Sequence, residues 1–405
     1  MMSPADRTRA QDTNAPGVPL SLAEERAARV RDVRYELRFS IPETMTGAVT
    51  GSVTIHFTLS DASHPLVLDF AGNPDRVRDM RAGSTPIAVD VRNEHIVIPV
   101  SALRKGANAI TLSFDASDLA LNRSPEFMYT LFVPARARLA FPCFDQPDIK
   151  ARYALTLDVP AGWEAVSNGL ETGRDPKDSG TTVRFGETRP VSTYLFAFAA
   201  GRFQIETAER GGRRLRMFHR GADPQKVARN RDAIFDLHAS ALAWLERYTD
   251  LPYPFGKFDF VLVPSFQFGG MEHPGSIFYN ASSLLLDPSA TINQQLGRAS
   301  LIAHETAHMW FGDLVTMRWF NDVWMKEVFA NFMAAKIVNP SFPQINHELR
   351  FLYAHYPSAY DVDRTPGTNA IRQPLDNLNE AGSLYGAIIY QKAPIVMRQL
   401  EMIVT

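Results

Sequence analysis

Apolar and polar residues alternate along much of the first half of the chain. From Val33 to Phe39, and again from Val53 to Leu59, every second residue is apolar, which is the period of a strand with one buried face. Turn residues such as Gly72-Asn73-Pro74 and Asp175-Pro176 separate these runs. The pattern predicts an antiparallel β domain that closes near Gly201, with strands over residues 33–39, 53–59, 66–70, 95–98, 109–114, 153–159 and 194–200.

The second half has a mixed pattern. Asp223-Pro224 predicts an N-cap and the first position of a helix that runs to about Tyr248. Residues 258–263 form a short apolar run typical of a strand, and residues 269–275 are expected to form a loop or a sheet edge. The fold class predicted is therefore multidomain, with a β-sandwich-like domain followed by an α+β domain.

Two further helices are predicted in the second half. Apolar residues recur at helical spacing from Thr291 to Phe311, and Gly312 offers a stop. The second helix begins near Asn321 or Asp322 and places Glu327 on an otherwise apolar stripe, with Val323, Ala330 and Ala334. These two helices carry the candidate chemistry.

The first of these helices contains His304-Glu305-Thr306-Ala307-His308, and eighteen residues separate His308 from Glu327. Positions i and i+4 share one helix face, so both imidazoles can bind one metal ion. With Glu327 they make three ligands and leave the fourth position of a tetrahedral zinc ion for water. Glu305 is then the natural base toward that zinc-bound water. The alternative is a solvated or ion-paired Glu and two ordinary histidines.

With this motif and this spacing to Glu327, the sequence resembles the zinc aminopeptidases of the aminopeptidase N family, a branch of the gluzincins. Besides the histidine motif, Gly269-Gly270-Met271-Glu272-His273 and Tyr390-Gln391-Lys392 match that family. The resemblance extends over about residues 33–400, with supporting phrases at Phe141–Pro147, Val166–Gly169, Tyr194–Phe198 and Leu251–Lys257.

The resemblance implies a thermolysin-like catalytic domain, one Zn²⁺ ion held by His304, His308 and Glu327, and Glu305 as the base. It also implies that peptides with a free N-terminus are the substrates. Glu272 would pair with the substrate's α-ammonium, within a substrate-binding segment of Gly269, Gly270, Met271, Glu272 and His273. Tyr390 would stabilise the oxyanion, since a phenol is a neutral donor.

Several positions depart from the family pattern. His273 stands where the family usually has Asn, and Ala393-Pro394 follows Lys392 where Gly is common. Val133 occupies a position where many relatives have Gln or Glu, so amine binding is expected to rest largely on Glu272. The catalytic domain is expected to be incomplete, because the sequence stops at Thr405 before the large helical domain that family members have.

Composition changes the interpretation little. The chain has 405 residues, of which 45% are hydrophobic, and its formal net charge of −2 gives no support for binding to nucleic acid. No membrane span is predicted, because no apolar stretch approaches the roughly 20 residues that a transmembrane helix needs. Its single cysteine, Cys143, is interpreted as a buried apolar residue and suits the cytoplasm. The domains predicted are a disordered tail over residues 1–28, the β domain over 29–203 and the catalytic domain over 204–405. The sequence makes no prediction of oligomeric state.

Two rival functions use the same residues. A thermolysin-like endopeptidase or an epoxide hydrolase would share the metal centre, although the Glu272 segment argues against an endopeptidase. A non-catalytic peptide-binding protein would have no physical need for Glu305.

Overall fold

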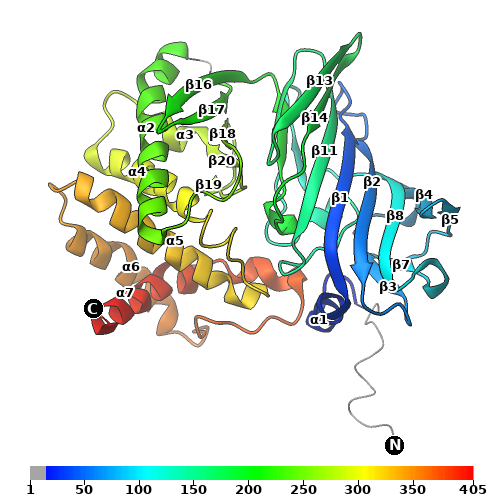
Figure 1. Ribbon diagram of the computed structural model, residues 1–405. Helices are drawn as coiled ribbons and strands as arrows, with labels where there is room; N and C mark the ends of the chain where they lie inside the picture. The colour runs from blue at the N-terminus through cyan, green and yellow to red at the C-terminus, as the bar shows by residue number, and fades with distance from the viewer. Residues whose placement is uncertain (1–14, 222, 405) are drawn as a thin grey trace, which may run out of the picture. The chain divides into compact units, whose positions relative to one another are not determined.

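The computed structural model describes residues 15–221 and 223–404 (Figure 1). The chain divides into two compact units. Residues 1–203 and 375–381 belong to the first, and residues 204–374 and 382–405 belong to the second. The short return of residues 375–381 to the first unit was not expected from the sequence pattern.

The first unit is built almost entirely of strands. The strand runs expected from the alternating pattern are present, and four of the seven are longer by a few residues. The run expected over residues 194–200 is wrong in its first half, because Thr193–Leu195 form a 3-10 turn and the strand begins at Phe198. Its elements are α1 Leu20–Arg29, β1 Val30–Ser40, β2 Thr50–Leu59, β3 Leu66–Asp69, β4 Val77–Ala82, β5 Thr85–Pro86, β6 Val91–Arg92, β7 His95–Ile98, β8 Gly106–Asp115, β9 Leu121–Arg123, β10 Phe127–Thr130, β11 Ala151–Pro160, β12 Glu164–Ser167, β13 Glu171–Lys177, β14 Gly180–Phe185 and β15 Phe198–Gly201.

These strands form three sheets. The largest has eight strands in the order β13-β14-β11-β1-β2-β8-β4-β5, and the others have the orders β12-β15-β10-β9 and β3-β7-β6. The expectation of a purely antiparallel domain is wrong in one place, because β1 and β11 pair in parallel, with Val33 opposite Ala151. The long connection between them allows the chain to return in the same direction.

The predicted turn at Asp175-Pro176 is also wrong. Both residues lie in β13, which is the edge strand of the eight-stranded sheet. Proline is tolerated there because an edge strand leaves one row of N–H groups unpaired.

Aromatic side chains fill the core of the first unit. Phe39 of β1 lies 5.0 Å from Phe198 of β15, measured between ring centroids, so the eight-stranded and four-stranded sheets face each other across this cluster. Tyr153 stacks on Tyr35 at 5.0 Å and on Phe196 at 4.4 Å. This packing supports the sandwich-like arrangement that the alternation predicted.

The prediction that residues 1–28 are a disordered tail is wrong from residue 20 onward, while residues 1–14 lie outside the described residues. Leu20–Arg29 form α1, and Arg26 within it is completely buried. Its guanidinium donates to both carboxylate oxygens of Asp69, at 2.9 and 2.8 Å, and to Gln146 at 2.8 Å. A polar, arginine-rich segment is thus held by a buried ion pair, which composition does not reveal.

The second unit combines a five-stranded sheet with helices. The sheet has the order β16-β17-β18-β20-β19, in which β17, β18 and β20 are parallel. The unit's elements are β16 Gln204–Arg210, β17 Arg213–His219, α2 Pro224–Thr249, β18 Phe258–Val263, β19 Gly270–Met271, β20 Ser276–Asn280, α3 Ala281–Leu284, α4 Ile292–Ala307, α5 Val323–Val338, α6 His347–Asp363 and α7 Ala393–Val404.

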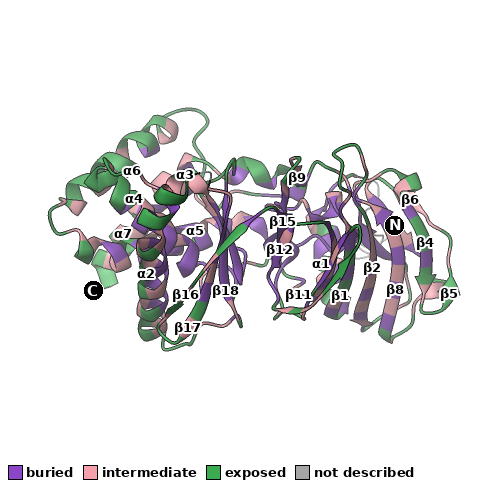
Figure 2. Ribbon diagram, turned by 90° about the horizontal axis from the view of Figure 1, so that it is seen from above, coloured by how far each residue is buried: buried purple, intermediate pink, exposed green. Residues whose placement is uncertain are grey.

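Helices lie against one face of this sheet (Figure 2), and every residue of its central strand, β18, is buried. On α2, His238 stacks on Phe260 of β18 at 4.2 Å and bonds to the Tyr279 hydroxyl at 3.0 Å. Small side chains bring α2, α4 and α5 together in a buried cluster of Ala241, Leu296, Ala299, Ala303, Ala334 and Val338. The architecture of β followed by α+β is therefore as predicted, and α4 and α5 are packed side by side.

Among residues 15–221 and 223–404, no helix has the length and apolar character that crossing a lipid bilayer requires.

Candidate metal centre

Local signals at both ends of α4 place the histidine motif. Thr291 and Gln294 form a capping box at the start, since the Thr291 N–H donates to Gln294 Oε1 at 2.8 Å and the Gln294 N–H donates to Thr291 Oγ1 at 3.3 Å. The helix ends at Ala307 rather than at the predicted Phe311, because the His308 carbonyl accepts from Asp313 instead of Gly312. His308 is therefore the C-cap, still one turn after His304.

The three predicted ligand atoms converge. The Nε2 atoms of His304 and His308 are 3.0 Å apart, and Glu327 Oε2 lies 3.5 Å from the first and 3.8 Å from the second. Tetrahedral ligands at zinc distances of 2.0–2.2 Å are separated by about 3.3–3.6 Å. The spacing of the three atoms therefore fits a single ion of this size.

The outer nitrogens of the two rings define which tautomers are present. His304 Nδ1 lies 3.0 Å from the side-chain oxygen of Asn331, and His308 Nδ1 lies 3.0 Å from the backbone carbonyl of Phe311. Both partners are acceptors, so each neutral ring carries its proton on Nδ1 and turns a lone pair on Nε2 toward Glu327. Two lone pairs and a carboxylate oxygen that face one another require a cation, and this donor set suits zinc.

Glu305 lies beside this centre and against a glycine. A methyl group on Gly270 would come within 2.4 Å of Glu305 Oε1, so any other residue at that position would force the carboxyl group to move from its place. Burial raises the pKa of Glu305 to about 8, against the opposing charge of His304. A carboxyl group whose pKa lies near the working pH can both take up and give back a proton.

Glu272 follows β19, the edge strand that was predicted as a loop or sheet edge. It, Glu305 and His308 each place one ligand-type atom within 4.8 Å of the other two. Burial acts to raise the pKa of Glu272, but the charge of Lys326 outweighs it and holds the pKa at about 2. Glu272 is therefore a buried carboxylate next to the metal centre.

Tyr390 lies in a π-helical turn, Ile388–Lys392, directly before α7. Such turns are frequent at functional sites. Burial raises the pKa of the Tyr390 phenol, and the negative charge of Glu327 adds to the effect, so the phenol is neutral. The Tyr385 ring lies 6.4 Å from that of Tyr390.

The other predicted substrate-binding residues are less directly placed. Met271 is buried and pairs with Phe278 across the β19–β20 ladder. The His273 ring is completely buried against Phe278, at 4.6 Å between ring centroids, and burial lowers its pKa to about 3. Gly269 is exposed, and Val133 is a buried residue of the first unit.

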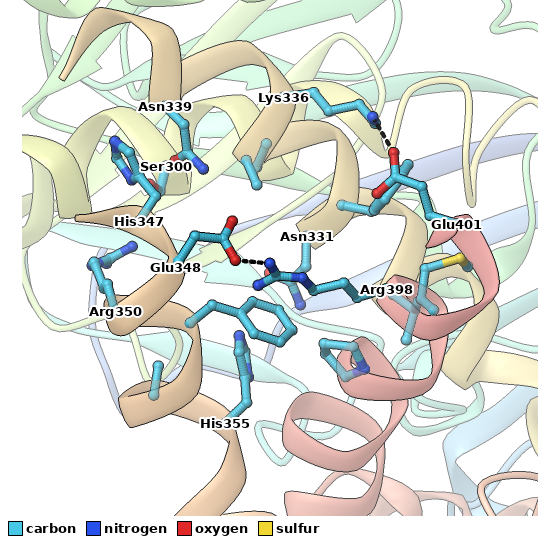
Figure 3. A pocket seen from close by; sticks show the side chains of 18 of the residues that line it. Ser300, Asn331, Lys336, Asn339, His347, Glu348, Arg350, His355, Arg398 and Glu401 are labelled. Atoms are coloured by element: carbon cyan, nitrogen blue, oxygen red, sulfur yellow. Dashed lines mark hydrogen bonds and ion pairs between the residues drawn. The ribbon is translucent and has the colours of Figure 1, made fainter. Parts of the chain in front are cut away.

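A groove of about 980 Å³ lies among α2, α4, α5, α6 and α7 (Figure 3). Asn331 lines it, so the residue that supports His304 is reached from this groove. An ion pair between Arg398 and Glu348 joins α7 to α6 across it. Lys336 and Glu401 make a second ion pair at 2.5 Å.

Sequence reasoning missed two residues of the centre. Asn331 lies one turn after Glu327 on α5, so its spacing alone places it on the ligand's helix face. Lys326 directly precedes Glu327 and is buried. From the sequence alone, a lysine at that position is expected on the surface. Neither has a signal in a motif search.

Comparisons with known proteins agree with this geometry. Residues 32–195 match the profile described as "Peptidase M1 N-terminal domain", and residues 234–405 match "Peptidase family M1 domain". The chain is 36% identical to the puromycin-sensitive aminopeptidase of Caenorhabditis elegans over 275 residues, which are 67% of this chain and 29% of that protein.

Two other relatives match more of the chain. Probable aminopeptidase 1 of Sulfurisphaera tokodaii is 30% identical over 331 residues, which are 80% of this chain and 42% of the relative. Aminopeptidase M1-C of Oryza sativa subsp. japonica is 31% identical over 394 residues, or 91% of this chain and 43% of the relative. The chain thus spans less than half the length of these relatives. Its two matched domains, in that order, show that it belongs to peptidase family M1.

Proposed function

We propose that this protein is a zinc-dependent aminopeptidase that hydrolyses the N-terminal bond of peptides with a free amino group. The observation that carries the proposal is the convergence of His304 Nε2, His308 Nε2 and Glu327 Oε2, with a buried carboxyl group, Glu305, beside them. The names of the relatives in three organisms support the same activity.

His304, His308 and Glu327 would hold the zinc ion. When bound, zinc supplies a Lewis acid that polarises a carbonyl oxygen and makes a water molecule acidic. Three protein ligands leave a coordination position open, which is typical of a catalytic site rather than a structural one.

Glu305, Tyr390 and Glu272 would perform proton transfer, oxyanion stabilisation and binding of the substrate's amino group. Glu305 accepts the proton of the attacking water and returns it to the leaving amine, a task that suits its raised pKa. Tyr390 donates a hydrogen bond to the carbonyl oxygen as negative charge develops there. Glu272 pairs with the α-ammonium of the substrate and so fixes the cut at one residue from the N-terminus.

Hydrolysis of matched substrates tests the proposal. The zinc-loaded chain should cleave leucyl p-nitroanilide and leave N-acetyl-leucyl p-nitroanilide intact, whereas Glu272→Ala should lose this discrimination. Equal cleavage of both compounds by the unaltered chain would indicate an endopeptidase-like site instead.

A cytoplasmic location, which rests on the single cysteine, also stays part of the proposal, and fractionation of the source cells tests it.

A further inference from the structure

One buried ammonium group bridges two carboxylates of the candidate site. Lys326 Nζ donates to Glu272 Oε1 and lies 3.0 Å from Glu327 Oε1. The side chains of Lys326, Glu272 and Glu327 are only 4%, 4% and 5% exposed. Lysine is rarely buried to this degree unless it is paired, so the bridge is what keeps the ammonium inside the protein.

The two carboxylates use their oxygens differently. Glu327 turns Oε2 to the histidines and Oε1 to Lys326, so the lysine occupies the oxygen that is farther from the metal position. Within residues 15–221 and 223–404, the Glu272 carboxylate accepts only from Lys326. The group proposed to bind a substrate's ammonium is thus already neutralised by an ammonium of the chain itself.

We propose that Lys326 is a specificity-determining residue whose ammonium competes with the α-ammonium of the substrate for Glu272. The inference rests on the proposed function, because it takes Glu272 to be the amine-binding group. A bound substrate amine must displace Lys326 or share one carboxylate with it. Sharing brings two like charges close together in a buried site, which is unfavourable.

The charge of the site supports competition. Lys326 adds one positive charge to a buried site that also takes a divalent ion. Without the lysine charge, the same site is one unit more negative and attracts a cation more strongly. Lys326 keeps a second partner, Glu327 at 3.0 Å, so it can give up Glu272 without becoming an unpaired buried charge.

A binding experiment separates this role from a structural one. The probe is 3-methylbutylamine, which carries an ammonium group but no bond to cleave, and 3-methylbutan-1-ol is its uncharged control. Calorimetry would give both dissociation constants for the zinc-loaded chain and for Lys326→Met, Lys326→Gln and Lys326→Arg. Zinc content and thermal unfolding are measured for each variant, so that folded proteins of equal metal content are compared.

Removal of the charge in Lys326→Met or Lys326→Gln should tighten amine binding by about tenfold, the factor that corresponds to about 1.4 kcal/mol. Binding of the alcohol should not change, and Lys326→Arg, which keeps the charge, should bind the amine as the unaltered chain does. The gain should also vanish in a Glu272→Gln background, because no carboxylate is then available to free. Two charge-free variants are used so that a folding defect in one leaves the other to decide.

Unchanged or weaker amine binding in the folded charge-free variants would overturn the inference, as would an equal gain for the alcohol or a gain that persists with Glu272→Gln. Failure of the proposed function looks different. If Glu272→Gln alone leaves amine binding unchanged, Glu272 is not the amine-binding group. If Glu272→Gln weakens binding but neither charge-free variant strengthens it, only the role of Lys326 is wrong.

Discussion

Substitution of Asn331 by leucine should weaken zinc binding, although Asn331 is not a metal ligand. Its side-chain oxygen lies 3.0 Å from His304 Nδ1 and is the acceptor that keeps the ring's proton on that nitrogen. Leucine has a similar size but no acceptor, so His304 loses the bond that favours a bare Nε2. Loss of such a partner typically lowers metal affinity by about 10–100-fold, or about 1.4–2.7 kcal/mol.

The assay is a zinc competition titration against a chromophoric chelator, with circular dichroism to verify folding. Asn331→Asp is the matched control, because it keeps an acceptor at the same place and should bind zinc at least as tightly as the unaltered chain. His308 provides an internal reference, since its own acceptor is the backbone carbonyl of Phe311 and no side-chain substitution removes it. If Asn331→Leu binds zinc as tightly as the unaltered chain, the argument from the tautomers is refuted.

Three further outcomes are expected. Glu305→Gln should retain zinc, because the ligands are untouched, yet lose about 10²–10⁴ in kcat; steady-state kinetics with substantial residual turnover would remove Glu305 from proton transfer. Tyr390→Phe should lose about 10²–10³ in kcat with little change in KM, and a change in KM alone would reassign the hydroxyl to substrate binding. Burial acts to raise the pKa of Asp69, but Arg26 and His95 outweigh it and hold it at about 2, below the usual value of about 3.9 in unfolded chains. The ionised Asp69 therefore stabilises the fold fully above about pH 4, and this contribution is lost as the pH falls through about 2. The free energy of unfolding measured in urea should fall by about 2 kcal/mol between these two pH values. Asp69→Asn should not show this loss.

The sequence predicted the long strands β1, β2, β8 and β11 because each has one buried face and an alternating pattern, but it did not predict β9, β10 or β12–β14. It did not predict that β1 and β11 are parallel, since alternation fixes which face is buried and says nothing about the direction of a partner. The helix α1 was missed for a different reason. Its stability depends on the buried pair between Arg26 and Asp69, which are distant in sequence.

The candidate metal site was predictable because its ligands depend on local geometry. His304 and His308 are one helical turn apart, and Glu327 lies on a helix that packs against the first. The supporting residues were not predictable in this way. Asn331 and Lys326 act through single long-range contacts, and an asparagine or lysine near a motif has no distinctive pattern. The contact of Gly270 with Glu305 was not predicted either, and its place near the substrate stays a prediction.

Titration of the metal-free chain with zinc, with hydrolysis of leucyl p-nitroanilide followed at each step, tests the central claim most directly. Because a single zinc ion is held by His304, His308 and Glu327, activity should rise in proportion to added zinc and reach its maximum at one ion per chain. Hydrolysis that is independent of zinc, or that needs a second equivalent, would contradict a single catalytic zinc at this centre.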